Sequence, residues 1–263
     1  MVSEQANIQV LQAQLEFYLE NGFLAVESIS APEELVWMRE VYDRLFEQRA
    51  GREVGDQFDL GGIDDENAPP VLPQILGPDR YAPELRTGLF RRNAEAIARQ
   101  LLGDGVQYQG SHAILKPAFT GAATPWHQDE AYWNPDEDHD SISIWIPLQP
   151  ATLENGCMWF VPGSHRLEVL PHHCINNDPR IHGLEVDCAD VSGAVACPLP
   201  AGGCTIHPVR TLHYTGPNLS SEPRRALILG FGLPATPRKQ PRVFYWNDQK
   251  QTPREARAQA KAP

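Results

Sequence analysis

The sequence predicts an α+β protein with a mainly β core, and three observations support this fold class. Apolar residues at helical spacing occupy the N-terminal part, residues 1–103. Short apolar runs bounded by Gly, Pro and Asn fill residues 104–235. The chain also has 24 prolines and 20 glycines in 263 residues, which is typical of many turns. Helices followed by strands favour strands that close into a sandwich or a jelly roll, within a single domain over residues 1–248.

The N-terminal part contains three expected helices. Apolar residues recur at helical spacing over residues 8–18, and Gly22 offers a stop for this first helix. Ser30 and Glu33 fit a capping box at the start of the second helix, which Gly51 is expected to end. A short strand between these two helices and the third helix are expected over residues 23–26 and 83–102.

The core is expected to contain at least five strands. Short apolar runs predict them at residues 107–115, 141–148, 158–161, 204–207 and 226–231. Residues 52–74 and 166–200 lack periodicity and are expected to be long loops of the kind that often cover a site. The polar tail, residues 249–263, is expected to be mobile.

Composition and charge exclude several function classes. Lys and Arg number 22 against 34 Asp and Glu, so the formal net charge of −12 gives no overall attraction for nucleic acids or anionic lipids. No apolar run approaches the length that crosses a bilayer. The first basic residue is Arg39, so neither a secretory leader nor a transit peptide is expected. Five cysteines without CxxC spacing indicate reduced thiols in the cytoplasm.

One histidine in the chain has an acidic residue two positions later, in His127-Gln128-Asp129. Residues i and i+2 of a strand share a face, so this spacing can direct an imidazole and a carboxylate toward one metal ion. In a chain of 263 residues with nine histidines and 34 acidic residues, chance alone would produce about one such pair. Taken alone, the pair is better explained as a turn Asp beside a hydrogen-bonded His.

Residues farther along the chain strengthen the metal hypothesis. His213 supplies a second imidazole, and two His with one carboxylate form the facial triad of non-haem Fe(II) oxygenases. The open face of such a metal can hold a 2-oxo acid and O2. Arg224, with Thr215 as its hydroxyl neighbour, could hold the far carboxylate of a dicarboxylate co-substrate. The simpler alternatives are a surface Arg at a strand start and a turn Thr.

Eight motifs in a fixed order resemble one enzyme family. They are residues 20–27 (ENGFLAVE), 30–34 (SAPEE), 126–129 (WHQD), 145–148 (WIPL), 154–157 (ENGC), 161–165 (VPGSH), 213–218 (HYTGPN) and 223–225 (PRR). With their flanks they extend over residues 16–232 and resemble the phytanoyl-CoA dioxygenase (PhyH) family of Fe(II)/2-oxoglutarate oxygenases. The resemblance implies a double-stranded β-helix, the cupin-like jelly roll, with helices packed on one sheet.

The resemblance also implies roles for individual residues. His127, Asp129 and His213 match the iron ligands, and Arg224 matches the partner of the 2-oxoglutarate C5 carboxylate. Three more residues match co-substrate pocket positions of the family: Thr215, Trp145 and, in a looser alignment, Gln74. For Trp145 a purely structural role as a core aromatic is an equal alternative.

Several residues compete for these roles. Arg225 is the rival of Arg224, but alternation along a strand directs only one of them inward, and spacing from His213 favours Arg224. His207 is the rival third ligand. The remaining histidines are assigned to loops: His165 to a structural turn, and His139 and the 172–174 cluster (HHC) to solvated loops, where a zinc site is the minor alternative.

The expected activity is therefore an Fe(II)- and 2-oxoglutarate-dependent dioxygenase that releases succinate and CO2. Halogenating relatives of this fold carry a small residue in place of the metal carboxylate, whereas Asp129 is present here. This favours hydroxylation of a C–H bond, or a related desaturation or ring closure, over halogenation. The expected substrate is a small organic molecule such as one of secondary metabolism, with O2 as the other reactant. A non-catalytic or non-oxidative metal-binding jelly roll is the alternative.

Overall fold

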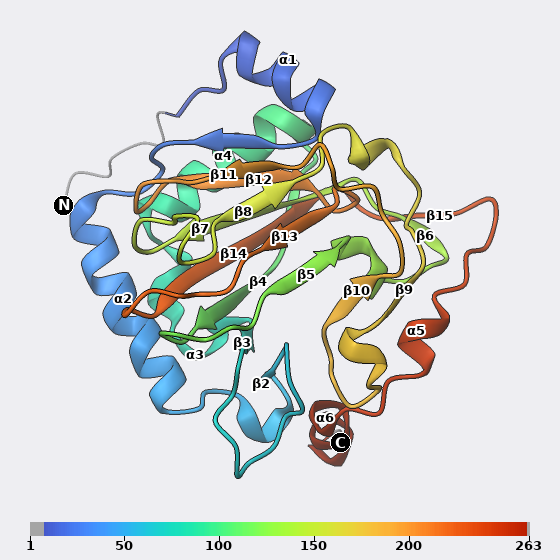
Figure 1. Ribbon diagram of the computed structural model, residues 1–263. Helices are drawn as coiled ribbons and strands as arrows, with labels where there is room; N and C mark the ends of the chain where they lie inside the picture. Colours follow the sequence, from blue (N-terminus) through green and yellow to red (C-terminus); the bar gives the residue numbers. More distant parts are fainter. Residues whose placement is uncertain (1–7, 262–263) are drawn as a thin grey trace.

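The computed structural model describes residues 8–261, and its core is built from two antiparallel sheets (Figure 1). The larger sheet has seven strands, in the spatial order β1 (Leu24–Val26), β12 (Cys204–Pro208), β7 (Ser141–Pro147), β14 (Arg224–Gly232), β4 (Gln107–Lys116), β3 (Pro73–Leu76) and β2 (Gln57–Asp59). The smaller sheet has four, in the order β11 (Val195–Cys197), β8 (Met158–Phe160), β13 (His213–Thr215) and β5 (Thr124–His127). The prediction of an α+β protein with a mainly β core is confirmed.

Two further strand pairs lie outside these sheets. They are β9 (His172–Cys174) with β10 (Leu184–Val186), and β6 (Glu137–Asp138) with β15 (Thr236–Pro237). Residues 1–7 and 262–263, which fall in the expected helical part and in the expected mobile tail, lie outside the described residues. Within residues 8–261, none of the helices has the length and apolar character needed to cross a bilayer.

Alternation along the central strands separates the core from the site. On β7, Ile144 and Ile146 pack into the hydrophobic cluster that the larger sheet shares with the helices, whereas Trp145 faces the smaller sheet. On β14, Leu227 faces the helices and Ile228 faces the smaller sheet. The period of two that defines a strand therefore gives this sheet one face for stability and one for chemistry.

The N-terminal helices cover the outer face of the larger sheet. They are α1 (Gln12–Asn21), α2 (Pro32–Glu47), α3 (Pro78–Tyr81) and α4 (Leu89–Leu102), with the 3₁₀ turns η1 (Arg52–Val54) and η2 (Pro83–Arg86). Gly22 ends α1 in the left-handed conformation at φ 76°, as the sequence predicts. The strand expected at residues 23–26 is confirmed as β1. The part expected to be helical also supplies β2 and β3, because strands of three or four residues show too little periodicity to be recognised.

The expected boundaries of two helices are wrong. No side chain caps α2, whose N-cap is Ala31, so the capping box of Ser30 and Glu33 does not form. The helix ends at Glu47, before Gly51. The expected third helix is split into η2 and α4, because the Glu34 carboxylate accepts the amides of Leu89 and Phe90 at 2.5 and 2.9 Å and so starts α4 from another helix.

The two expected loops and the expected mobile tail are also more ordered than predicted. Residues 52–74 contain β2, and residues 166–200 contain β9, β10, β11 and the turn η5 (Ile175–Asn177). The tail forms α6 (Pro253–Lys261), after α5 (Tyr245–Asp248), and α6 lies beside η1 (Figure 1). Arg257 anchors α6 by donating to the Arg52 carbonyl at 2.9 Å and to the Asp64 carboxylate. These partners are distant in sequence, so composition could not indicate them.

Candidate active site

Strand pairing between β5 and β13 assembles three predicted metal ligands. His127 is the last residue of β5 and His213 is the first residue of β13, and the two are direct cross-strand partners. Asp129 begins the 3₁₀ turn η3 (Asp129–Tyr132). His127 and Asp129 therefore do not lie in one continuous strand, although the sequence suggests that they do. The chain turns after His127, and this turn brings the carboxylate back beside both imidazoles.

The three side chains form a compact group of donor atoms. Asp129 Oδ1 lies 3.7 Å from His127 Nε2 and 3.5 Å from His213 Nε2. One ligand atom from each residue lies within 4.8 Å of the other two. His127 Nδ1 contacts the Pro125 carbonyl at 2.8 Å and His213 Nδ1 contacts the Thr211 carbonyl at 2.9 Å. Each Nδ1 thus carries the proton, and each Nε2 lone pair is free for a metal.

The electrostatics of this group suit a divalent metal ion. Burial lowers the pKa of His127 and holds the pKa of His213 well below its ordinary value, so both imidazoles are neutral at neutral pH. Two neutral imidazoles and one carboxylate on one side of a metal match the donor set of non-haem Fe(II).

The second carboxylate oxygen of Asp129 is held from behind. Ser143 on β7 donates its hydroxyl to Asp129 Oδ2 at 2.6 Å. His207, the rival ligand, is buried with Nε2 3.4 Å from the same oxygen, and it is outside the donor group found within residues 8–261. Asp129 therefore presents Oδ1 to the metal position. Sequence reasoning missed Ser143 because nothing in the motif indicates which strand crosses behind the carboxylate.

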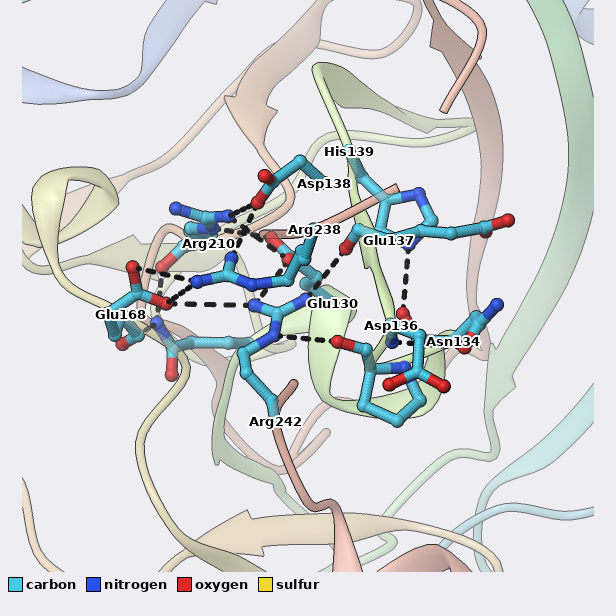
Figure 2. A network of polar contacts seen from close by, with 12 residues as sticks. Glu130, Asn134, Asp136, Glu137, Asp138, His139, Glu168, Arg210, Arg238 and Arg242 are labelled. Carbon is cyan, nitrogen blue, oxygen red and sulfur yellow. Dashed lines mark hydrogen bonds and ion pairs between the residues drawn. The ribbon is translucent and has the colours of Figure 1, made fainter. Parts of the chain in front are cut away.

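A buried acid next to Asp129 is the centre of an arginine network (Figure 2). Glu130 is fully buried, and its carboxylate accepts Arg210 Nε at 2.6 Å and lies 2.8 Å from Arg242 Nη1. Arg210 lies three positions before His213, so the network ties together the segments that carry two of the ligands. It continues toward the surface through Asp138, Glu168 and Arg238 (Figure 2).

Arg224 lies on the inner face of β14 and is almost fully buried. Its Nε and Nη1 have no hydrogen-bond partner within residues 8–261, and its guanidinium carbon lies 5.3 Å from the centre of the Trp145 ring. Burial lowers the pKa of Arg224 to about 10, so it is charged at neutral pH. Arg225 points outward and binds Asp43 on α2 at 2.6 and 2.9 Å. The buried Arg224 guanidinium therefore offers unpaired hydrogen-bond donors to an anion that enters the cavity.

One large cavity joins these groups. Its volume is about 1120 Å³, and its lining includes the triad, Arg224, Trp145, Thr215 and Gln74. Thr215 donates its hydroxyl to that of Thr124 at 2.9 Å. Lys116, the cross-strand partner of Arg224, is buried beside it and donates to the Ala122 carbonyl at 2.9 Å. Burial, and next the charge of Arg224, hold the pKa of Lys116 well below its usual value.

The sequence assigns four other histidines to loops, and one of these assignments is wrong. His172 is not in a solvated loop: it is fully buried, and its Nε2 accepts the Gln128 amide at 3.2 Å. His173 contacts Asp187 and Glu185 at 2.5 and 2.9 Å. His165 lies in the turn η4 (Ser164–Arg166), and His139 lies at the cavity next to Trp133.

Known proteins are similar to this chain in sequence and in fold. The chain is 27% identical over 220 residues to a probable alpha-ketoglutarate-dependent hypophosphite dioxygenase from Stutzerimonas stutzeri, covering 81% of this chain and 76% of that protein. The crystal structure of EvdO2 from Micromonospora carbonacea var. aurantiaca is 41% identical, with a TM-score of 0.80 over 92% of this chain and 98% of that one. The same protein complexed with 2-oxoglutarate matches with a TM-score of 0.78 and 38% identity, over 91% of this chain and 97% of that one.

These neighbours confirm the expected jelly roll. The model of one family, phytanoyl-CoA dioxygenase (PhyH), matches residues 18–226. This range is most of the chain and contains the triad together with Arg224. The chain belongs to the phytanoyl-CoA dioxygenase family.

Proposed function

We propose that this protein is an Fe(II)- and 2-oxoglutarate-dependent dioxygenase that hydroxylates a C–H bond of a small organic molecule. The observation that carries the proposal is the convergence of His127, Asp129 and His213 in the cavity that also contains Arg224. Membership of the phytanoyl-CoA dioxygenase family and the 2-oxoglutarate complex of EvdO2 support it. These comparisons favour the oxygenase over the non-oxidative alternative.

The chain's own residues prepare the metal position. His127 and His213 would bind Fe(II) through Nε2, since their Nδ1 atoms are held by backbone carbonyls. Asp129 would bind through Oδ1, while the Ser143 hydroxyl holds its other oxygen and His207 Nε2 lies 3.4 Å from that oxygen. Partners behind the ligands fix orientation and basicity and commonly change metal affinity by about 10- to 100-fold.

Arg224 would bind the far carboxylate of 2-oxoglutarate. Its guanidinium is buried with two free donor atoms, and a charge-assisted pair with a carboxylate would satisfy them. Trp145 supports the guanidinium from one side, and the Thr215 hydroxyl lines the same space. The bound metal and 2-oxoglutarate supply oxidation by O2, with succinate and CO2 as products. The protein supplies the orientation of the reacting groups and the cavity that contains them.

The reducing cytoplasm is the location that we propose. All five cysteines carry free thiols, four of them buried. Free thiols are typical of reducing compartments. The partners that we propose are a small organic substrate and O2, with no nucleic acid or membrane involved.

Anaerobic addition of Fe(II) and 2-oxoglutarate tests the proposal directly. We expect a weak visible charge-transfer band in the wild type and in Asp104→Ala, an exposed surface control, and its loss in Asp129→Ala. A screen of small molecules for substrate-dependent succinate formation would then identify the reaction. A band of equal strength in Asp129→Ala, or no band in the wild type, would contradict the proposal.

A further inference from the structure

The cavity extends from the metal triad to a wall built partly by the C-terminal segment. Four residues form what we call the C-terminal wall: Tyr132, His182, Lys250 and Arg254, all of which line the cavity. Tyr132 belongs to η3, directly after the ligand segment, and His182 belongs to the 166–200 insertion. Lys250 and Arg254 lie between α5 and α6 and in the first turn of α6. Three distant parts of the chain therefore meet at one wall.

The wall is a stack of rings with a cation at each end. Lys250 Nζ lies 4.6 Å from the centre of the Tyr132 ring, which stacks on His182 at 5.8 Å with an interplanar angle of 25°. His182 meets Phe58 of β2 edge-on at 4.8 Å, and the Arg254 guanidinium lies 4.8 Å from the centre of the Phe58 ring. Cation–π contacts orient both charged groups, but they do not neutralise them.

Both cations lack an anionic partner. Within residues 8–261, neither Lys250 nor Arg254 forms an ion pair or a side-chain hydrogen bond, and Arg254 Nε is buried without any partner. Burial lowers the pKa of Arg254 and lowers that of Lys250 to about 8. Burial, and next the charges of these two cations, hold the pKa of His182 well below its usual value, so His182 is neutral.

The nearby carboxylates are occupied or face solvent. Glu255 accepts the Thr252 amide at the start of α6, at 3.3 Å. Two other acids whose charges reach Arg254 are bonded elsewhere, Asp56 to Arg80 and Asp64 to Arg52 and Arg257. The remaining acids of the cavity lining are Asp129 in the triad and the exposed Asp136 and Asp248.

The segment that carries the two cations is fixed in place. Trp246 in α5 donates its indole N–H to the Ala131 carbonyl at 2.8 Å, and the Gln251 amide donates to the Pro179 carbonyl at 2.8 Å. Arg257 anchors the following turn to η1. The wall is therefore preorganised, and a ligand that binds it does not have to order the segment first.

We propose that Lys250 and Arg254 bind an oxyanion of the substrate, a phosphate or a carboxylate group, at a position distinct from that of Arg224. Two partly buried cations without partners are compensated when an anion enters the cavity. The inference rests on the proposed function and narrows its substrate to an anionic organic molecule. The charged group of that molecule lies at the C-terminal wall while the C–H bond to be oxidised lies at the triad.

Calorimetric titration of the anaerobic protein loaded with Fe(II) and 2-oxoglutarate tests this inference, because 2-oxoglutarate already fills the Arg224 position. The probes are phenyl phosphate and benzoate, with benzyl alcohol as the uncharged comparison, at constant ionic strength. We expect one or both anions to bind and the alcohol not to bind. Affinity should fall about tenfold or more in Lys250→Gln and in Arg254→Gln, and remain at the wild-type level in Lys239→Gln, an exposed control.

Charge-preserving variants separate recognition from folding. Lys250→Arg and Arg254→Lys should retain most of the anion affinity, whereas a defect caused by misfolding would persist. The charge-transfer band must form in every variant, since it reports the triad and Arg224 and not the wall. If the band forms but neither anion binds the wild type, or if both Gln variants bind as tightly as Lys239→Gln, the anion site is refuted while the proposed function stands.

Discussion

Replacing Arg224 with Met should stabilise the empty protein and strongly weaken co-substrate binding. Arg224 is 1% exposed, it has two donor atoms without partners, and a second buried amine, Lys116, lies across the strand from it. A buried unsatisfied polar group costs about 1–3 kcal/mol. Met has a similar length and no charge, so the free energy of unfolding of Arg224→Met without ligands should rise by about 1–3 kcal/mol.

The effect on 2-oxoglutarate binding has the opposite sign. Removing one partner of a buried charge pair costs about 2–5 kcal/mol, which corresponds to binding that is weaker by about 30-fold to several thousand-fold. Urea unfolding of the metal-free protein measures the first effect, and anaerobic calorimetry with Fe(II) measures the second. Together the two measurements separate the destabilisation caused by burying the Arg224 guanidinium from its contribution to 2-oxoglutarate binding.

The neighbouring arginine provides the control. Arg225→Met removes an outward ion pair with Asp43, so it should cost at most about 1 kcal/mol of stability and leave 2-oxoglutarate affinity unchanged. If Arg224→Met bound 2-oxoglutarate within about threefold of the wild type, the assignment of this residue would be wrong. A loss of stability in the empty protein would show that another group, such as a bound water molecule, already satisfies the guanidinium.

Three further changes test the surroundings of the triad. Ser143→Ala should weaken Fe(II) binding by about 10-fold or more, measured in competition with a chelator. Ser141 has a buried hydroxyl without a partner within residues 8–261, so Ser141→Ala should leave the Fe(II) affinity unchanged. Equal Fe(II) affinities of the two variants would show that Ser143 does not position the Asp129 carboxylate. Glu130→Gln leaves Arg210 and Arg242 without their buried counter-charge, so the free energy of unfolding measured in urea should fall by about 3–5 kcal/mol. The control Glu137→Gln should change it little. A loss below about 1 kcal/mol in Glu130→Gln would contradict this prediction. Burial lowers the pKa of His172 to about 4, so below pH 6.5 the unfolded chain binds a proton that the folded chain does not. Stability should therefore fall by about 3 kcal/mol between pH 6.5 and 4, and the fall should be smaller in His172→Gln; parallel curves for the two proteins would refute it.

The ligand residues could be predicted from the sequence because their chemistry is specific. His127, Asp129 and His213 are marked by residue type, spacing and ordered flanking motifs, and the structure brings all three together. Their local structure could not be predicted, since β5 and β13 are only four and three residues long and pair across more than 80 positions. Short strands of this kind are defined by their partners rather than by their own periodicity.

The groups behind the ligands could not be identified from the sequence. Ser143 was recognised only as part of a strand, and Glu130 follows the motif with no signal of its own. Glu130 acts through Arg210, 80 positions away, and Ser143 reaches Asp129 from another strand, 14 positions away. The C-terminal segment shows the same limit, because its polar composition predicted mobility while Arg257 finds its partners about 200 positions earlier.

The pair Arg224-Arg225 shows how strand register determines which residue can serve the reaction. A shift of β14 by one residue would exchange the two faces and still place an arginine in the cavity. The register is fixed by groups on the outer side: Gln149 exchanges hydrogen bonds with both backbone polar groups of Arg225, at 2.8 and 2.9 Å, and Asp43 binds its guanidinium. After such a shift, Leu227 would have to enter the space between the sheets, where Ile228 now packs. The backbone of Arg225, held by Gln149, thus helps to keep the strand in the register that directs Arg224 inward, and this contact is independent of the Arg225 side chain.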